Sequence, residues 1–281
     1  ARQANRSPSW EPALERSYGD HLGERPAGAG RLDAGVRPGY CPPRQTLPMD
    51  ILERSNRVVT WCLTCLLVVP VCTVLMRVLN RTRIVGKQHL QGAPLPLVFA
   101  SNHVTIWDDG LVDTLIFWPR VFREYDFIPY HVPEERNFFK SPLLSWFMRR
   151  MKSIPVRRGE GLFQPAMDRI IAALKDGGCV RVFPEGTRTR SGVLGVGRPG
   201  VGRVLYETGA AVVPCFHRGL DQVLPIGSVV PRIGKRVDIV IGPPFSVDDL
   251  RALPNTRETW QKIADRLMEK IAELARPAAN R

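Results

Sequence analysis

Apolar and polar positions divide the chain into three regions. Residues 1–48 are rich in Arg, Pro, Gly and Ala and lack a periodic apolar pattern, which predicts a disordered leader. Met49 opens the first run with a structured pattern, so one interpretation places the native start there and makes the leader an over-long gene model. Residues 49–83 are predicted to form a membrane-associated helical region, and residues 84–281 the main domain.

The segment Val58–Met76 contains nineteen residues without a charge, close to the roughly 20 that a helix needs to cross a bilayer. A buried core helix is the alternative, and Pro70 could kink the segment into a shallow, monotopic insertion. Four basic residues follow the segment: Arg77, Arg81, Arg83 and Lys87. This excess of positive charge predicts that the bulk of the chain faces the cytoplasm.

Beyond residue 84, short β-rich apolar runs alternate with helical patterns, which predicts an α/β domain. A helix is expected over Gln164–Lys175, where apolar residues follow a helical period before a Gly-Gly stop. A final helix is expected after the capping box of Asn255 and Glu258, covering the sheet. The candidate strands are Leu95–Ala100, Phe127–His131, Ser153–Val156, Cys179–Phe183, Ala211–Phe216 and Val237–Ile241.

The composition allows one large domain or two small ones, with 281 residues, 44% apolar and 24% charged. It excludes a wholly disordered chain, collagen and a coiled coil. A formal net charge of +13 predicts anionic partners: nucleic acid, phospholipid headgroups or phosphorylated metabolites. The long uncharged segment argues against nucleic acid. Three of the six cysteines, Cys62, Cys65 and Cys72, fall inside that segment, so the cysteines are expected to be reduced.

The first candidate site follows the strand Leu95–Ala100. His103 comes just after the strand and Asp108 five residues later, a pairing that suits a general base and the carboxylate that orients it. Residues five apart on one continuous helix point about 140° away from each other. We therefore expect His103 in the turn before a helix and Asp108 in its first turns. The alternative is a structural or capping histidine.

The second candidate site ends the strand Cys179–Phe183. There Pro184, Glu185 and Gly186 break the apolar run before Thr187, Arg188 and Arg190, which suits a phosphate clamp or, alternatively, a solvated basic turn. Loops at the same edge of a sheet gather together, so the two candidate sites would converge. A third basic patch could face the same anion, with at most one or two of its residues functional: Arg149, Arg150, Lys152, Arg157 and Arg158.

Four blocks of the chain together resemble the glycerolipid acyltransferases, the 1-acylglycerol-3-phosphate acyltransferase superfamily. The blocks are Asn102-His103-x4-Asp108, Ile154–Gly159, Phe183–Arg188 and Ala211–Cys215. Their order and spacing both fit, over roughly residues 84 to 250. The doubled Asp108-Asp109 is similar to the tafazzin branch. The resemblance implies a mixed central sheet flanked by helices, with the glycerol-3-phosphate acyltransferase-like fold.

The resemblance also implies a role for each matched residue. His103 would be the general base that takes the proton of a glycerol hydroxyl, and Asp108 would orient it. Arg190 is added on charge grounds alone. Contacts with the phosphate of the acceptor are expected from Arg158, Glu185, Gly186, Thr187 and Arg188. The family transfers the acyl group directly, without metal, bound cofactor or acyl-enzyme, so Cys179 and Cys215 are expected to be structural.

The chain is thus expected to be a membrane-associated enzyme that acylates a lysophosphatidate or lysophospholipid. Acyl-CoA or acyl carrier protein is the expected donor, because Thr187-Arg188 is kept as in acyl-CoA-dependent members. A tafazzin-like transacylase, with membrane phospholipid as donor, is the alternative. A non-catalytic scaffold would have lost His103 or Asp108, and both are present. The acyl chain would meet residues that suit a channel or a core equally well: Asn102, Ile106, Trp107, Leu111 and Phe117.

Overall fold

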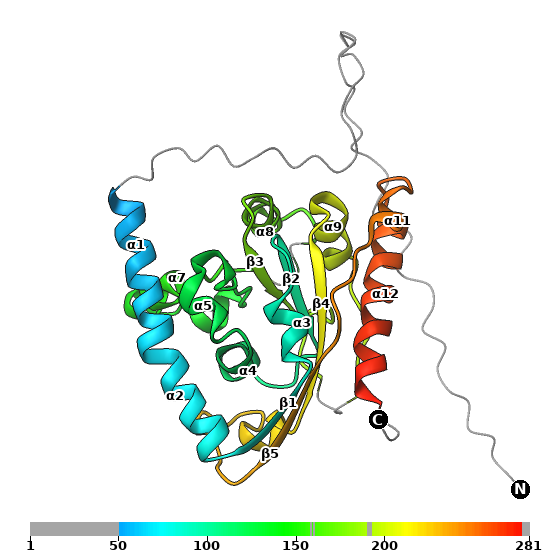
Figure 1. Cartoon of the computed structure of the whole chain (residues 1–281). Coiled ribbons are helices and arrows are strands. Elements are labelled where there is room, and N and C mark those ends of the chain that lie inside the picture. The colour runs from blue at the N-terminus through cyan, green and yellow to red at the C-terminus, as the bar shows by residue number, and fades with distance from the viewer. Residues whose placement is uncertain (1–50, 158, 160, 190–192, 277–281) are drawn as a thin grey trace, which may run out of the picture. The chain divides into compact units, whose positions relative to one another are not determined.

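The computed structural model describes residues 51–157, 159, 161–189 and 193–276. The predicted leader, Arg158 and Arg190 therefore lie outside the described residues. A five-stranded sheet occupies the centre, in the order β1-β5-β4-β2-β3 (Figure 1). The strands are β1 (Arg81–Val85), β2 (Leu97–Ser101), β3 (Cys179–Val182), β4 (Ala211–Arg218) and β5 (Arg236–Ile241). All neighbouring pairs are parallel except β4 with β5, so the prediction of a mixed sheet is confirmed.

Helices flank the sheet and connect its strands. A continuous helical run begins the described chain, with α1 (Ile51–Cys62) and α2 (Val69–Thr73) separated and followed by π-helical segments, Leu63–Val68 and Val74–Val78. The helices that follow are α3 (Lys87–Gln91), α4 (Asp108–Ile116), α5 (Arg120–Arg123), α6 (Glu135–Phe138), α7 (Pro142–Arg150), α8 (Pro165–Lys175), α9 (Pro199–Thr208), α10 (Leu220–Val223), α11 (Asp248–Arg251) and α12 (Arg257–Ala275). A 3-10 turn, Tyr125–Phe127, follows α5.

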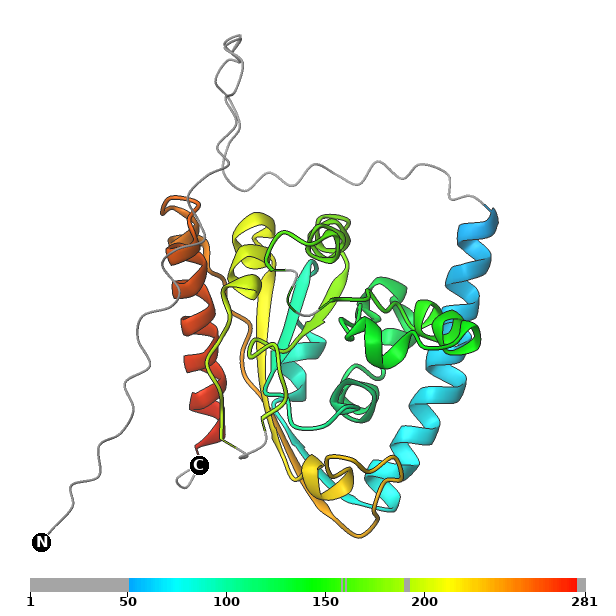
Figure 2. The ribbon, with the colours of Figure 1, turned by 180° about the vertical axis from the view of Figure 1, so that it is seen from behind.

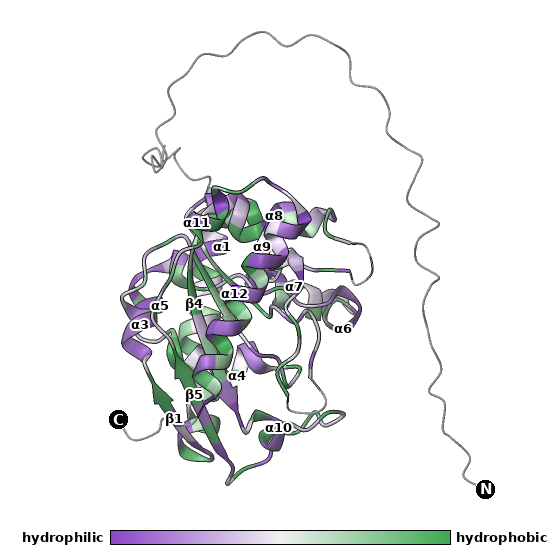
Figure 3. Cartoon of the chain, turned by 90° about the vertical axis from the view of Figure 1, so that its right-hand side faces the viewer, coloured by the Kyte–Doolittle hydropathy of each residue, from purple (hydrophilic) through white to green (hydrophobic). Residues whose placement is uncertain are grey.

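The sheet has an apolar core on each face. Leu97 and Phe99 of β2 face a core shared with α4, whereas Val98 and Ala100 face a core shared with α8, α9 and α12. All five residues of β2 are buried, which explains its unbroken apolar run. The long N-terminal helix and α12 lie on opposite sides of the sheet (Figures 1 and 2). Helix α12 covers β4 and β5, in front of them in Figure 3, as predicted.

The last helix begins differently from the prediction. Its N-cap is Thr256, whose hydroxyl accepts a hydrogen bond from the backbone N–H of Thr259 at 3.3 Å. The predicted capping box was wrong, because the Asn255 side chain is engaged elsewhere and accepts a hydrogen bond from the indole N–H of Trp260 at 2.8 Å. Helices α9 and α12 then pack so closely that a Cβ on Gly202 would lie 1.8 Å from the carbonyl oxygen of Trp260.

Two predicted strands are not part of the sheet. Phe127–His131 and Ser153–Val156 form only isolated bridges, including one between His131 and Ser153. Both segments and their flanks contain prolines, which lack the N–H group that a continuous ladder needs. The strand β1 was missed because its exposed positions alternate with partly buried ones and carry arginines. The strands predicted at β2, β3, β4 and β5 and the helix α8 are confirmed.

The N-terminal helix presents an apolar face to the outside. Cys65, Val69 and Met76 are buried, and α2 packs against α4. Leu66 and Val71 point outward, each with more than half of its surface exposed. By length and composition the helix Ser55–Val78 could cross a membrane.

Candidate active site

His103 lies in the turn between β2 and α4, and Asp108 is the first residue of α4, as the spacing predicts. The Nδ1 of His103 lies 2.9 Å from Oδ2 of Asp108. Backbone N–H groups of Val104 and Thr105 donate to the same carboxylate at 2.6 and 2.9 Å, and the Thr105 hydroxyl donates at 2.6 Å. The carboxylate is fully buried and fixes the imidazole, so Nε2 is the nitrogen left to act on a substrate.

A second histidine, which is buried, lies close to the carboxylate of Asp108. Nε2 of His217, on β4, lies 3.9 Å from Oδ2 of Asp108. Asn102 ties the two strands together, because its side chain donates to the carbonyl of His217 at 2.8 Å and accepts from its N–H at 2.9 Å. Burial alone would raise the pKa of Asp108, because it disfavours the ionised carboxylate. The imidazoles of His217 and His103 outweigh burial and hold this pKa below its ordinary value. Burial lowers the pKa of His217 to about 4, so this ring is neutral near pH 7 and is charged only in the acid range in which Asp108 itself would titrate.

The loop after β3 is folded around Glu185. Its carboxylate accepts hydrogen bonds from the backbone N–H of His103 at 3.2 Å and of Gly195 at 2.9 Å. Burial raises the pKa of Glu185 above its ordinary value. Gly186 adopts φ +65°, and a Cβ there would lie 2.8 Å from the side chain of Arg198. Glu185 thus positions the loop and His103, while the turn at Gly186 leads Thr187 and Arg188 to the pocket.

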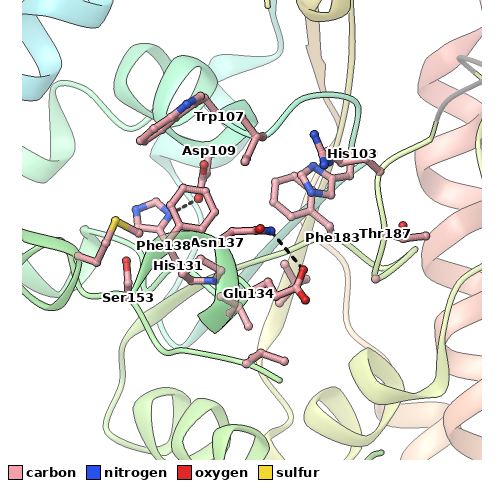
Figure 4. A pocket seen from close by; sticks show the side chains of 18 of the residues that line it. His103, Trp107, Asp109, His131, Glu134, Asn137, Phe138, Ser153, Phe183 and Thr187 are labelled. Atoms are coloured by element: carbon pink, nitrogen blue, oxygen red, sulfur yellow. Dashed lines mark hydrogen bonds and ion pairs between the residues drawn. The ribbon is translucent and has the colours of Figure 1, made fainter. Parts of the chain in front are cut away.

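A cavity of about 990 Å³ joins the predicted residues. His103, Gly186, Thr187 and Arg188 all line it, so the convergence of the two strand ends is observed (Figure 4). Its lining also includes Arg198, which the sequence prediction missed, and Arg157, which forms an ion pair with Glu135.

The other basic residues of the third patch have different surroundings. Arg149 lies over the ring of Phe139 and Arg150 over Trp146, so both guanidinium groups rest on aromatic side chains. Lys152 is buried and donates to the carbonyl of Ile128 at 2.6 Å. None of these three residues lines the pocket.

The apolar lining comes from both sides of the sheet. We call the part of the pocket lined by residues of α2, α6 and α7 one arm, and the part lined by residues of α8 and α9, including Met167, Ile170 and Val201, the other arm. Among the candidate channel residues, Ile106, Trp107 and Leu111 line the pocket. Phe117 and Asn102 do not, because Phe117 belongs to the core and Asn102 bonds to the backbone of β4.

The pocket contains a second histidine–carboxylate pair that the sequence prediction missed. Nδ1 of His131 lies 3.2 Å from Oδ2 of Asp109 (Figure 4). The same nitrogen lies 4.0 Å from Oδ2 of Asp113. Burial disfavours the charged imidazole, but Asp109 outweighs it and raises the pKa of His131. Arg181 lies 3.2 Å from Asp113 in an ion pair without hydrogen-bond alignment. Burial raises the pKa of Asp113 to about 7 despite this arginine.

The cysteines of the described chain are all free thiols. Cys179 and Cys215 are fully buried, and burial raises the pKa of the Cys215 thiol to about 12. A protonated thiol is a poor nucleophile. Among the described residues there is also no group of three or more His, Cys, Asp or Glu side chains that could hold a metal ion.

A mixed α/β domain with His103 and Asp108 at the end of β2 is the architecture of a glycerolipid acyltransferase. Residues 81–218 match the acyltransferase family model. The chain belongs to this acyltransferase family, as the four sequence blocks predicted.

Known relatives come from two branches of the family. The chain is 30% identical over 204 residues to tafazzin from Drosophila melanogaster, covering 71% of this chain and 54% of the relative. It is 31% identical over 186 residues to the chloroplastic 1-acyl-sn-glycerol-3-phosphate acyltransferase LPAT1 of Arabidopsis thaliana, covering 66% and 49%. The chain thus spans about half the length of these relatives.

The fold is also found in a solved structure. The 1-acyl-sn-glycerophosphate acyltransferase PlsC from Thermotoga maritima superposes with a TM-score of 0.56 at 19% identity, covering 82% of this chain and 86% of that chain. This likeness confirms the predicted fold class.

Proposed function

We propose that this protein transfers a fatty acyl group to the free hydroxyl of a lysophosphatidate or lysophospholipid, with acyl-CoA or acyl carrier protein as donor. The observation that carries the proposal is the His103–Asp108 pair at the wall of a pocket that also presents Thr187 and Arg188. Family membership supports the reaction class.

The geometry supplies a route for the proton. The acceptor hydroxyl gives its proton to Nε2 of His103 as its oxygen attacks the thioester carbonyl, and Asp108 stabilises the imidazolium that forms. Collapse of the tetrahedral intermediate forms the new ester and breaks the carbon–sulfur bond. The imidazolium then returns the proton to the departing thiolate. No group is consumed in this cycle, so the site needs no bound cofactor.

The acceptor phosphate is assigned to the side of the pocket formed by the loop after β3. The guanidinium of Arg188 remains charged and can bind phosphate oxygens in a bidentate manner, and the Thr187 hydroxyl can donate a further hydrogen bond. Arg158 and Arg190 are proposed as additional contacts on sequence grounds. This placement leaves the two apolar arms for the acyl chains.

The substrates are proposed to arrive from a membrane. Outward-facing apolar residues of the N-terminal helix would enter the bilayer, and Arg77, Arg81 and Arg83 just after them would meet anionic headgroups at about 1 kcal/mol each. Val68 and Cys72 of this helix also line the pocket, which brings the site next to the lipid phase. The catalytic domain is proposed to face the cytoplasm.

A second candidate function is a CoA-independent transacylase that moves acyl chains between phospholipid and lysophospholipid. The similarity to Drosophila tafazzin favours it. The same histidine would then return its proton to the oxygen of the departing lysophospholipid instead of a thiolate.

Radiolabelled acyl transfer to lysophosphatidate and a panel of lysophospholipids tests both candidates. Each assay contains acyl-CoA, acyl carrier protein thioester or diacyl phospholipid as the sole donor, with CoA removed from the last. We expect product from a thioester in the wild type and none with His103→Ala. Product from phospholipid alone would favour the transacylase. Activity that survives in a folded His103→Ala variant would contradict the general-base role on which both candidates depend.

A further inference from the structure

In one arm of the pocket, two polar side chains lie beside a group of apolar residues. The arm lies between α2, α6 and α7, and Trp107 packs edge-on against Phe138 at its side, with ring centroids 5.5 Å apart. Its apolar lining includes Val68, Trp107, Phe138, Phe147, Met148 and Met151. His131 and Ser153 also line the pocket here, beside each other and across from His103 (Figure 4).

The two polar residues are held side by side by the backbone. His131 and Ser153 are partners in a parallel β-bridge, and directly paired residues project on the same side of a sheet. The hydroxyl of Ser153 is buried and has no hydrogen-bond partner among the described residues. A buried hydroxyl without a partner costs free energy, so a ligand atom that formed a hydrogen bond with Ser153 would be favoured.

The second imidazole nitrogen of His131 is also available. Nδ1 faces Asp109 at 3.2 Å, which leaves Nε2 at the opposite edge of the ring with no partner in the part of the chain that the structure describes. The Nδ1–Asp109 contact is an ion pair without hydrogen-bond alignment, and a proton on Nδ1 places the lone pair of the neutral ring on Nε2, whereas the doubly protonated ring makes both nitrogens donors. The pair therefore offers Nε2, which accepts from the neutral ring and donates from the protonated ring, and one hydroxyl that can donate or accept.

The charges around this spot are balanced. Asp109 pairs with His131, and Asp113 pairs with Arg181, whose guanidinium lies between the rings of Phe99 and Phe183 at 4.6 and 4.5 Å. A phosphate or carboxylate placed here would add a further negative charge beside Asp109, the aspartate of this group that lines the pocket. The spot is therefore suited to an uncharged oxygen, and a hydroxyl can accept from Nε2 of His131 while donating to Oγ of Ser153.

We propose that His131 and Ser153 form a subsite for a hydroxyl group on an acyl chain, so that the enzyme selects hydroxylated over plain acyl chains. This inference rests on the proposed function, because a lipid acyl chain is the occupant. A plain hydrocarbon chain in this arm would leave both groups unpaired, at a cost that corresponds to about a 10-fold loss in kcat/KM. A hydroxylated chain would satisfy both.

Competition between matched substrates tests the subsite. The full chain in lipid vesicles is offered plain and hydroxylated acyl donors of equal length, with the hydroxyl at successive carbons, and then lysolipids in the same two series. We expect about a 10-fold preference in kcat/KM for one hydroxylated member of one series. Equal use of plain and hydroxylated members throughout both series would overturn the subsite. This is the result expected if ordered water satisfies His131 and Ser153 as well as a ligand hydroxyl does.

Two variants locate the preference. Ser153→Ala removes an oxygen that has no hydrogen-bond partner among the described residues, so the variant should fold as the wild type does and lose most of the preference for the hydroxylated chain. His131→Leu should lose the preference as well, and Ser145→Ala, a serine of α7 that does not line the pocket, should keep it. A preference that survives both pocket variants would overturn the subsite. Absence of transfer from any donor would instead overturn the proposed function, and the subsite with it.

Discussion

Replacing Asp108 by Asn isolates the electrostatic part of the site, because the two side chains have nearly the same shape. The Asp108 carboxylate is fully buried and accepts four hydrogen bonds, from His103, Val104 and two groups of Thr105. An amide has one acceptor oxygen and one NH₂ group. In either orientation the NH₂ group therefore faces N–H donors that it cannot satisfy.

The magnitude follows from which contacts are lost. Loss of two buried hydrogen bonds to a charged group should lower the free energy of unfolding by about 3–6 kcal/mol. An NH₂ group toward His103 would also favour the tautomer with its proton on Nε2, which removes the acceptor for the substrate proton. We expect kcat to fall by about 10³–10⁴-fold, as for other histidines that depend on an aspartate for their tautomer. KM should change little, because Asp108 does not touch the pocket.

Steady-state acyl transfer on vesicles measures kcat and KM, and denaturant unfolding measures the stability of each variant. Asp221→Asn, at an exposed position of α10, is the matched control and should leave both unchanged. The double variant Asp108→Asn with His103→Ala should have a kcat no lower than that of His103→Ala alone, because the two residues act as one unit. A folded Asp108→Asn variant with more than about a tenth of wild-type kcat would refute the general-base reasoning.

Three further predictions follow from the geometry. Gly202→Ala should lower the free energy of unfolding by about 2–3 kcal/mol, because its Cβ would clash with Trp260. Gly200→Ala is the control and should be neutral or stabilising, because its Cβ would have its nearest neighbour at 3.4 Å. Equal denaturation midpoints for the two variants would contradict this. Burial lowers the pKa of His217 to about 4, below its ordinary 6.5, so the folded protein should lose about 3 kcal/mol of stability as the pH falls from 6.5 to 4. Denaturation curves of His217→Leu should lack this loss, and an unchanged dependence of stability on pH would argue against a neutral buried ring. Arg188→Gln should raise KM for lysophosphatidate about 10-fold with a smaller effect on kcat, and an unchanged KM would place the phosphate elsewhere.

The fold was predictable where burial leaves a simple pattern. Leu97–Ser101 is buried on both faces and reads as an unbroken apolar run, so its strand and the polar residues that follow it were recognised. Arg81–Val85 alternates arginines with partly buried residues and was missed, because an edge strand buries too little to show its pattern. The segment at Ser153 has strand composition but lacks continuous pairing, which depends on where prolines fall along its neighbours.

The site was predictable where its residues are close in sequence. His103 and Asp108 are five residues apart, and their spacing alone predicts one in the turn before α4 and the other at its start. His131 reaches Asp109, and Arg198 reaches the loop at Gly186, only after the sheet has brought separate segments together. Two signals were available: His131 ends a predicted strand, and the doubled aspartate offers a second carboxylate. Neither signal identifies its partner without the tertiary structure.

The doubled aspartate links the reactive centre to the proposed hydroxyl subsite. Asp108 and Asp109 are consecutive in the first turn of α4, so their side chains diverge by about 100° around one rigid helix. Asp108 holds His103 and Asp109 holds His131, on opposite sides of the same pocket. A single turn of helix backbone thereby fixes the distance between two nitrogens: Nε2 of His103, which moves the proton, and Nε2 of His131, which would bind the hydroxyl. A chain whose carbonyl lies at His103 can then place only one of its carbons beside His131, so selectivity should fall sharply when the hydroxyl moves along the chain by a single carbon.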